Sequence, residues 1–264
     1  MLNDILGWLT DPANWTGPRG IPTRILEHLW YSALALAFST AVALPAGLWV
    51  GHTGRGRWVV TISNVARAVP SLGLLFAVEM IVGPYFASNL AFIIPSIVVL
   101  FLLGVPPLLS GTYAGIQAID PAARDAAYGM GMRSREVLRR VELPCAMPLI
   151  LSGLRGSTLQ IVATATIAAS VSLGGLGRYL LDGLAVRDYA QMAGGAILVA
   201  ALALILEGVL TIVSRYAVSP GLSGRFPRSS LVETSTAAPG APDASPARIL
   251  APSGARPTTE REVP

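Results

Sequence analysis

The chain has 264 residues, of which 53% are hydrophobic and 13% are charged, and its mean hydropathy is +0.59. Because soluble domains average about 25% charged residues, this composition excludes an ordinary soluble fold and indicates a membrane protein. The formal net charge of +4 is explained by arginines in cytoplasmic loops and needs no nucleic-acid partner.

Residues 1–24 precede the first long hydrophobic segment. Asp4, Asp11, Pro12 and Pro18 interrupt this stretch, so we expect no cleavable signal peptide there. We predict an extracytoplasmic N-terminal segment.

Five segments are long and apolar enough to span a membrane, since about twenty apolar residues cross the hydrocarbon core. They are residues 29–51, 58–82, 89–111, 145–173 and 190–214. We therefore predict an all-α membrane protein with about five transmembrane helices.

Arginine positions predict the orientation of these spans. Residues 52–57 contain two arginines and residues 112–144 contain five, whereas residues 83–88 contain none. Because arginine accumulates in cytoplasmic loops, we expect the N-terminus outside and the C-terminus inside. Residues 215–264 are rich in Pro, Ala, Ser and Thr and are predicted to be a disordered cytoplasmic tail.

Helix breakers mark candidate positions on a translocation path or gate. Pro70 and Ser71 interrupt the second span, residues 106–107 are both proline in the third, and Gly174 and Gly175 follow the fourth. Broken helices in membranes line cavities or are enclosed by protein. A path or gate role and a simple packing kink are both open interpretations.

Charged residues inside the spans are further candidates, because they are costly there. Arg67 and Glu207 both lie about 12–13 Å from the cytoplasmic ends of their spans at ~1.5 Å rise per residue. We expect them to pair inside the bundle. Glu79 is interpreted as a carboxylate near the outer interface, and Arg155 is expected to reach the cytoplasmic interface.

One polar stretch, "DAAYGMGMRSREVLRRVELP" (125–144), stands out from these apolar segments. Residues 120–121, Asp-Pro, predict the start of a short helix, and two following glycines predict its end. Ser134 is predicted to cap a second, amphipathic helix over residues 135–142, which Pro144 ends. We expect both helices within a loop over residues 112–144 at the cytoplasmic face.

This stretch resembles the EAA motif of ABC-importer permeases. The matching residues are Asp125, Ala126, Ala127, Gly131, Val141, Leu143 and Pro144. In that family the segment is the coupling helix, which docks into a groove on the cytoplasmic ATPase. Asp125 replaces the usual Glu and Val141 the usual Ile.

Over residues 25–214 the chain also resembles permeases that import glycine betaine, carnitine, choline or proline. The similar segments are "ARAVPSLGLL" (66–75), "PPLLSGTYAGI" (106–116) and residues 148–177. The resemblance implies a type I ABC-importer permease core in a bacterial cell membrane. The "SGT" at 110–112 differs from the expected Arg-Asn-Thr, and "GGLG" also occurs in methionine-importer permeases. An amino-acid importer is therefore an alternative.

The resemblance implies several partners. They are cytoplasmic ATPase subunits that use ATP and Mg, a second permease chain (a copy or a paralogue), an extracytoplasmic solute-binding protein and membrane lipid, with no nucleic acid. Quaternary ammonium solutes are usually held by aromatic side chains, for which Phe76 and Phe101 are the candidates within the spans.

The sequence also bears on functions of other classes. It contains no G-x-x-x-x-G-K-[ST], G-x-S-x-G or H-E-x-x-H motif, which argues against a membrane-embedded hydrolase. Cys145 is the single cysteine, and two histidines add too few ligands for a structural zinc site. We expect no catalytic residue, metal or cofactor on this chain. A channel or structural membrane protein fits the composition but gives no reason for the motif spacing.

Overall fold

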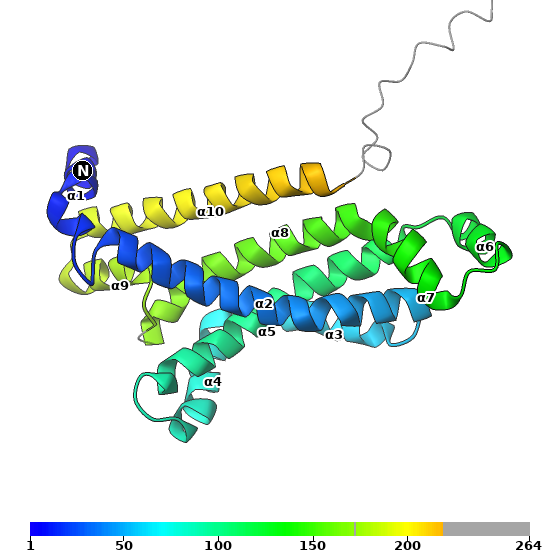
Figure 1. Cartoon of the computed structure of the whole chain (residues 1–264). Coiled ribbons are helices and arrows are strands. Elements are labelled where there is room, and N and C mark those ends of the chain that lie inside the picture. Colours follow the sequence, from blue (N-terminus) through cyan, green and yellow to red (C-terminus); the bar gives the residue numbers. More distant parts are fainter. Residues whose placement is uncertain (172, 219–264) are drawn as a thin grey trace, which may run out of the picture. The chain divides into compact units, whose positions relative to one another are not determined.

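The computed structural model describes residues 1–171 and 173–218, and these residues form helices and connecting turns without a strand (Figure 1). Four helical stretches are long and apolar enough to cross a membrane. They are α2 (Ile21–Thr53), α5 (Leu90–Gln117), Ser134–Val171, which contains α8 (Leu143–Ala168), and α10 (Tyr189–Ala217). A bent pair, α3 (Arg57–Ala66) and α4 (Ser71–Val82), makes up to five. The predicted fold class is confirmed.

The remaining elements are short. They are α1 (Leu2–Thr10), η1 (Pro12–Trp15), η2 (Gly83–Tyr85), α6 (Pro121–Gly129), α7 (Ser134–Val137), the π-helical η3 (Leu138–Glu142), η4 (Ala169–Val171) and α9 (Gly177–Val186). The first spanning helix, α2, begins at Ile21, which is earlier than the start at residue 29 that hydropathy predicts.

Small residues bring α5 close to both of its neighbours, α2 and α8. A Cβ atom on Gly111 would lie 2.7 Å from Gly153 Cα of α8, and one on Gly47 of α2 would lie 2.7 Å from Thr112 Cβ. Membrane helices gain van der Waals contact in this way, because lipid is as apolar as the side chains it would replace. The three helices α2, α5 and α8 thus form the packed centre of the bundle.

Helix α5 runs through Pro106 and Pro107, so the predicted interruption of the third span is wrong. Each proline removes a backbone donor, but hydroxyl groups bind nearby carbonyl oxygens. Ser157 Oγ donates to Gly104 O at 2.7 Å, and Ser39 Oγ also binds a carbonyl of α5. These bonds attach α5 to α8 and α2 at carbonyls next to those of Leu102 and Leu103, which lose their helical donors to the prolines.

The second span is broken where Pro70 predicts a break. Helices α3 and α4 meet at an angle of 99°, and Pro70 caps the start of α4 with an extended ψ of 119°. A residue that precedes proline is disfavoured in the helical region, so α3 cannot continue into α4. The predicted single segment 58–82 is thus two short helices, of which α4 packs against α5.

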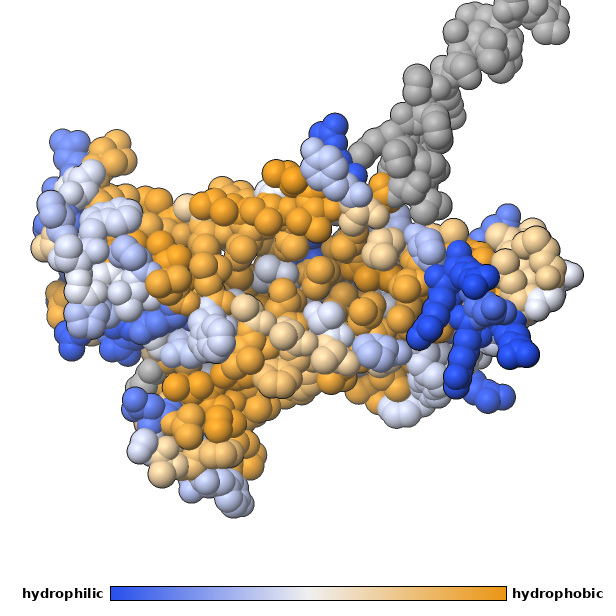
Figure 2. Space-filling model, in the orientation of Figure 1, coloured by the Kyte–Doolittle hydropathy of each residue, from blue (hydrophilic) through white to orange (hydrophobic). Residues whose placement is uncertain are grey.

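Hydrophobic side chains cover the sides of the bundle, and hydrophilic side chains gather at its two ends (Figure 2). One end holds α6 and α7, and the other holds α1 and α9 (Figure 1). In α10 only 6% of the apolar window is buried in the described chain. This distribution is that of a multi-pass membrane protein with polar elements on both sides of the membrane.

Candidate coupling site at the α6–α7 end

Helix α6 has the start and end that the sequence predicts. The Ala122 N–H donates to Asp120 Oδ1 at 2.9 Å, which caps the helix. After the last turn, the Met132 N–H donates to Ala127 O at 3.2 Å. Gly131 has φ +83°, a conformation that glycine adopts without steric cost.

One face of α6 is anchored and the other is free. Ala127 is 1% exposed, whereas Asp125 and Ala126 are exposed. Tyr128 and Met130 are 46% and 71% exposed. Small residues beside an adaptable methionine and an aromatic ring are typical of a protein-binding surface.

The second helix, predicted over residues 135–142, starts and ends differently in the structure than the sequence predicts. Ser134 is the first residue of α7 and does not cap it, and the N–H of the preceding Arg133 donates to Glu136 Oε2 at 3.0 Å. Pro144 does not end the helix, because α7, η3 and α8 follow one another without a gap. The π-helical turn widens the backbone just before Pro144, which then sits in the first turn of α8, where proline is tolerated.

Behind α6, polar side chains gather around the buried Glu142, and we call this group the coupling network: His52, Arg124, Ser134 and Glu142. Glu142 is 2% exposed, with Oε1 2.9 Å from Arg124 Nε and Oε2 2.6 Å from His52 Nδ1. His52 Nε2 lies 2.6 Å from Ser134 Oγ. Arg124 Nη2 donates to the carbonyl oxygen of Ile116. Buried carboxylates are stable only when they are paired in this way.

The coupling network and its bond to the Ile116 carbonyl join five parts of the chain. His52 comes from the last turn of α2, Arg124 from α6, Ser134 from α7 and Glu142 from the turn before α8, while Ile116 belongs to the end of α5. No sequence pattern indicates this network, because its members are up to 90 residues apart. The available signal was Glu142, a lone acidic residue among the apolar positions of the motif.

The remaining motif residues lie beside the network. Leu143 packs against a buried cluster that includes Ile116 and Ile150. Val141 is half-buried, and Pro144 is exposed. The structure thus brings the motif residues to one end of the bundle, with Leu143 in the packing and α6 on the surface.

The candidate path residues do not form one site. Arg67, Pro70 and Ser71 lie at the bend between α3 and α4, where Arg67 and Pro70 are exposed. Gly174 and Gly175 lie before α9, next to α2, and Glu207 lies on α10.

The predicted pair of Arg67 and Glu207 is wrong. Glu207 forms an ion pair with Arg155 of α8 instead, and the expectation that Arg155 reaches the cytoplasmic interface stays a prediction. Helix α10 packs against α8, α9 and α1, whereas α3 packs against α5. Arg67 and Glu207 share a depth in the bundle but lie on elements that do not pack against each other.

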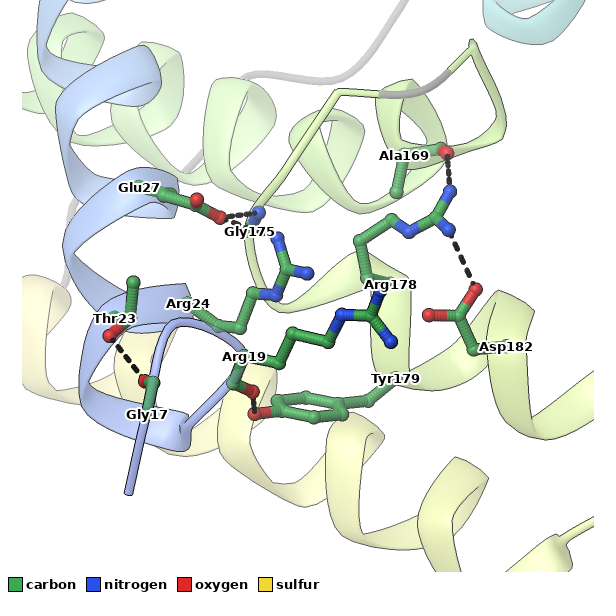
Figure 3. A network of polar contacts seen from close by, with 10 residues as sticks. All are labelled: Gly17, Arg19, Thr23, Arg24, Glu27, Ala169, Gly175, Arg178, Tyr179 and Asp182. Atoms are coloured by element: carbon green, nitrogen blue, oxygen red, sulfur yellow. Dashed lines mark hydrogen bonds and ion pairs between the residues drawn. The ribbon is translucent and has the colours of Figure 1, made fainter. Parts of the chain in front are cut away.

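The connection that contains Gly174 and Gly175 is fastened to the start of α2 (Figure 3). Glu27 Oε2 accepts hydrogen bonds from Arg24 Nη1 and from the Gly175 N–H, both at 2.8 Å. A side chain at Gly174 would collide with the Glu27 carboxylate, and Gly175 has φ +89°. Gly175 is therefore required by its backbone conformation, and a side chain at Gly174 would displace the Glu27 carboxylate from these contacts.

The N-terminal segment packs on this same end. The rings of Trp8 and Tyr179 meet edge to face, with centroids 5.1 Å apart and an angle of 77°. The Tyr179 hydroxyl donates to Arg19 O at 2.6 Å. Burial raises the pKa of this hydroxyl above its ordinary value.

The apolar bundle with polar elements at both ends defines a multi-pass membrane protein. The chain belongs to the family described as "Binding-protein-dependent transport system inner membrane component", which matches residues 43–224. It is a permease component of an ABC importer and not an enzyme.

Known proteins similar to the chain are permeases of osmoprotectant systems. The chain is 34% identical over 201 residues to the glycine betaine/carnitine/choline transport system permease protein OpuCB of Bacillus subtilis, covering 75% of this chain and 88% of that one. It is 28% identical to the osmoprotectant import permease protein OsmW of Salmonella typhimurium, with 78% and 94% covered.

The fold is also that of solved transporter structures. Two crystal forms of the inward-facing MetNI methionine ABC transporter match with a TM-score of 0.66 at 19% and 21% identity. Each match covers 80% of this chain and 100% of the solved chain. At this identity the likeness extends to the fold and not to the solute.

Proposed function

We propose that the chain is the transmembrane permease subunit of an ATP-driven importer for osmoprotectants, with α6 as the helix that receives movement from the ATPase. The observation that best supports this role is the coupling network. Through Arg124 and Glu142, the exposed helix α6 is attached to α2, α5 and α8. A displacement of α6 is therefore passed to the spanning helices instead of being lost in a loose loop.

Two cytoplasmic ATPase subunits are the proposed partners of α6, and they bind and hydrolyse ATP with Mg. The absence of a phosphate-binding loop from the sequence supports a separate ATPase. A second permease chain, a copy or a paralogue, completes the path. An extracytoplasmic solute-binding protein delivers the solute, and ATP-driven closure switches access by a rigid-body movement.

The proposed solutes are glycine betaine, carnitine and choline. Support comes from the relatives whose names contain these solutes, at 33–34% identity over about three quarters of the chain. The methionine transporter is similar at 19–21% identity, which supports the fold alone and gives no preference for an amino acid.

The proposed orientation has the α6–α7 end in the cytoplasm and the N-terminus outside. The five arginines of residues 112–144 support it, since arginine accumulates on the cytoplasmic side. In this orientation the Arg24–Glu27–Gly175 contacts lie at the outer face.

The α3–α4 bend is the proposed lining of the path. Irregular backbone at membrane depth is tolerated where it borders a water-filled cavity or is enclosed by protein. Arg67 and Pro70 at the 99° bend are exposed, which supports a position of the bend beside a water-filled path. Glu207, which is paired with Arg155, is assigned to packing of α10 on α8.

A reconstitution experiment tests the proposal. The chain, its ATPase and its solute-binding protein are placed in proteoliposomes, and uptake of labelled glycine betaine, choline, proline and methionine is measured with ATP inside. We expect ATP-dependent uptake of glycine betaine or choline above that of methionine. Uptake of methionine alone, or no co-purification of the ATPase, would contradict the proposal.

A further inference from the structure

A hollow of about 320 Å³ lies where α4, α5 and η4 meet, and we call it the Glu79 hollow. This volume is within the roughly 300–1,000 Å³ typical of small-molecule pockets. It is lined by Phe76, Glu79, Met80, Phe92, Ser170 and Val171. The hollow is therefore apolar except for one carboxylate and one serine.

The Glu79 carboxylate has a polar atom without a partner. Its Oε2 is buried and makes no hydrogen bond within the part of the chain that the structure describes. A carboxylate in such surroundings is costly unless a cation or a donor compensates it. An arginine paired with it would have made Glu79 a packing residue, but the ion pairs of the described residues do not include it.

Two aromatic rings stand beside this carboxylate. Phe76 and Glu79 are three residues apart on α4, which places them on one face of the helix. Phe92 comes from α5, and the two phenylalanines are 44% and 41% exposed. Aromatic faces attract cations within about 6 Å, and quaternary ammonium groups are held in this manner because they have no N–H to donate.

A second hollow, which has aromatic side chains but no charged one, provides a comparison for the Glu79 hollow. It has a volume of about 470 Å³ between α2 and α5 and is lined by apolar side chains, among them Phe38 and Phe101. It contains no charge that could compensate a cation. Of the two aromatic candidates in the sequence, Phe76 therefore faces a charged hollow and Phe101 an apolar one.

We propose that Glu79, Phe76 and Phe92 form a binding site for the quaternary ammonium group of the transported solute. The carboxylate supplies the opposite charge, and the two rings supply apolar and cation–π contact. The proposal rests on the proposed function for the solute class, but the site can be tested apart from transport. A choline headgroup of lipid has the same chemistry, and the test separates the two sources.

Carbodiimide labelling provides that test, since a hydrophobic carbodiimide modifies carboxyl groups at membrane depth and mass spectrometry locates the adduct. The permease–ATPase complex is placed in nanodiscs of phosphatidylethanolamine and phosphatidylglycerol. We expect choline chloride at about nine times its dissociation constant to slow labelling of Glu79 about tenfold, because the fraction of free sites falls as 1/(1 + L/Kd) at choline concentration L, whereas sodium chloride at equal ionic strength does not slow it. Equal labelling with and without choline would overturn the site.

A second set of nanodiscs contains phosphatidylcholine. Protection of Glu79 by this lipid, together with no further effect of added choline, would assign the site to lipid and overturn the solute assignment. Protection by added choline in both lipid mixtures supports it.

Variants distinguish a role of the two phenylalanine rings in binding from a role in packing. Phe76→Leu and Phe92→Leu should remove most of the protection by choline, while the matched control Phe38→Leu, in the apolar hollow, should retain it. In uptake, Glu79→Gln should raise the KM for choline about tenfold with unchanged recovery of the ATPase. An unchanged KM in Glu79→Gln would contradict the proposed binding site and leave the proposed function intact. Absence of choline and betaine uptake in the wild type would contradict the proposed function instead.

Discussion

Glu142 Oε2 lies 2.6 Å from His52 Nδ1, and this contact joins residues 90 positions apart in the chain. It links the last turn of α2 to the turn before α8. Because Glu142 also binds Arg124 of α6, a single buried carboxylate attaches α6 to two spanning helices. Under the proposed function, this attachment is the route by which a movement of α6 reaches the bundle.

Replacement of this carboxylate should destabilise the bundle. We expect Glu142→Ala to cost about 2–3 kcal/mol, less than the roughly 3–5 kcal/mol of a fully buried pair, because Arg124 is 23% exposed. Thermal unfolding of the purified permease–ATPase complex measures the loss. Glu142→Gln keeps the shape and should lose less. Equal unfolding temperatures for Glu142→Ala and wild type would show that the network does not stabilise the fold.

The turn after α6 can be tested with two glycines that differ in conformation. Gly131→Ala should cost about 1–2 kcal/mol, because Gly131 has φ +83°. Gly129 is helical and has open space around it, so Gly129→Ala should be neutral or stabilising by up to ~1 kcal/mol. Unfolding of both variants under the same conditions gives the comparison, and a similar effect at both positions contradicts the assigned turn.

The exposed surface of α6 should matter for assembly and not for folding. Met130 is 71% exposed, so Met130→Asp should leave the unfolding temperature of the permease unchanged. Recovery of the ATPase by affinity purification of the permease should fall several-fold, because a carboxylate replaces an apolar contact. Met130→Leu serves as the conservative control and should retain assembly. Full recovery of the ATPase with Met130→Asp argues against this docking surface.

The ion pair between Arg155 and Glu207 should appear as energetic coupling. In a double-mutant cycle of Arg155→Ala and Glu207→Ala, we expect the loss in the double variant to fall short of the sum of the single losses by about 0.5–3 kcal/mol. The matched cycle of Arg67→Ala with Glu207→Ala should be additive within about 0.3–0.5 kcal/mol. Folded yield and unfolding temperature are the measurements. Coupling in the second cycle alone would support a pair of Arg67 and Glu207 and contradict the pair of Arg155 and Glu207.

The close approach of α5 and α8 predicts a steric effect at one glycine. A Cβ on Gly111 would lie 2.7 Å from Gly153 Cα, so Gly111→Ala must push two backbones apart. We expect a cost of about 1–3 kcal/mol. Gly208 of α10 has open space around it, and Gly208→Ala should be harmless. An unfolding temperature of Gly111→Ala equal to that of Gly208→Ala would contradict the packing.

The sequence predicts the elements better than it predicts how they pair. Hydropathy locates the spans because burial in lipid depends on composition over about twenty residues, and Asp120 predicts the start of α6 because a cap acts within three residues. The pairing of Arg67 with Glu207 fails because depth is a property of one helix, whereas contact depends on which helices pack together. Glu207 pairs instead with Arg155, because α8 is the helix that packs against α10. Only the tertiary packing identifies this partner.

Local signals also fail where distant groups compete for the same atoms. Ser134 has the chemistry of a helix cap, but its hydroxyl lies 2.6 Å from His52 Nε2. Pro144 stops an isolated α-helix, yet a π-helical turn before it lets the helix continue. The Glu79 hollow likewise needs Phe92 from another helix, and no pattern within α4 indicates that ring.

The contact between Gly111 and Gly153 has a mechanical consequence. Gly153 divides α8 (Leu143–Ala168) into an arm of 10 residues toward the motif and an arm of 15 residues toward η4, or about 15 Å and 23 Å at ~1.5 Å per residue. If α8 tilts about this contact, the far end moves about 1.5 times as far as the motif end and in the opposite direction. The chain would then act as a lever, whose longer arm ends beside Ser170 of the Glu79 hollow.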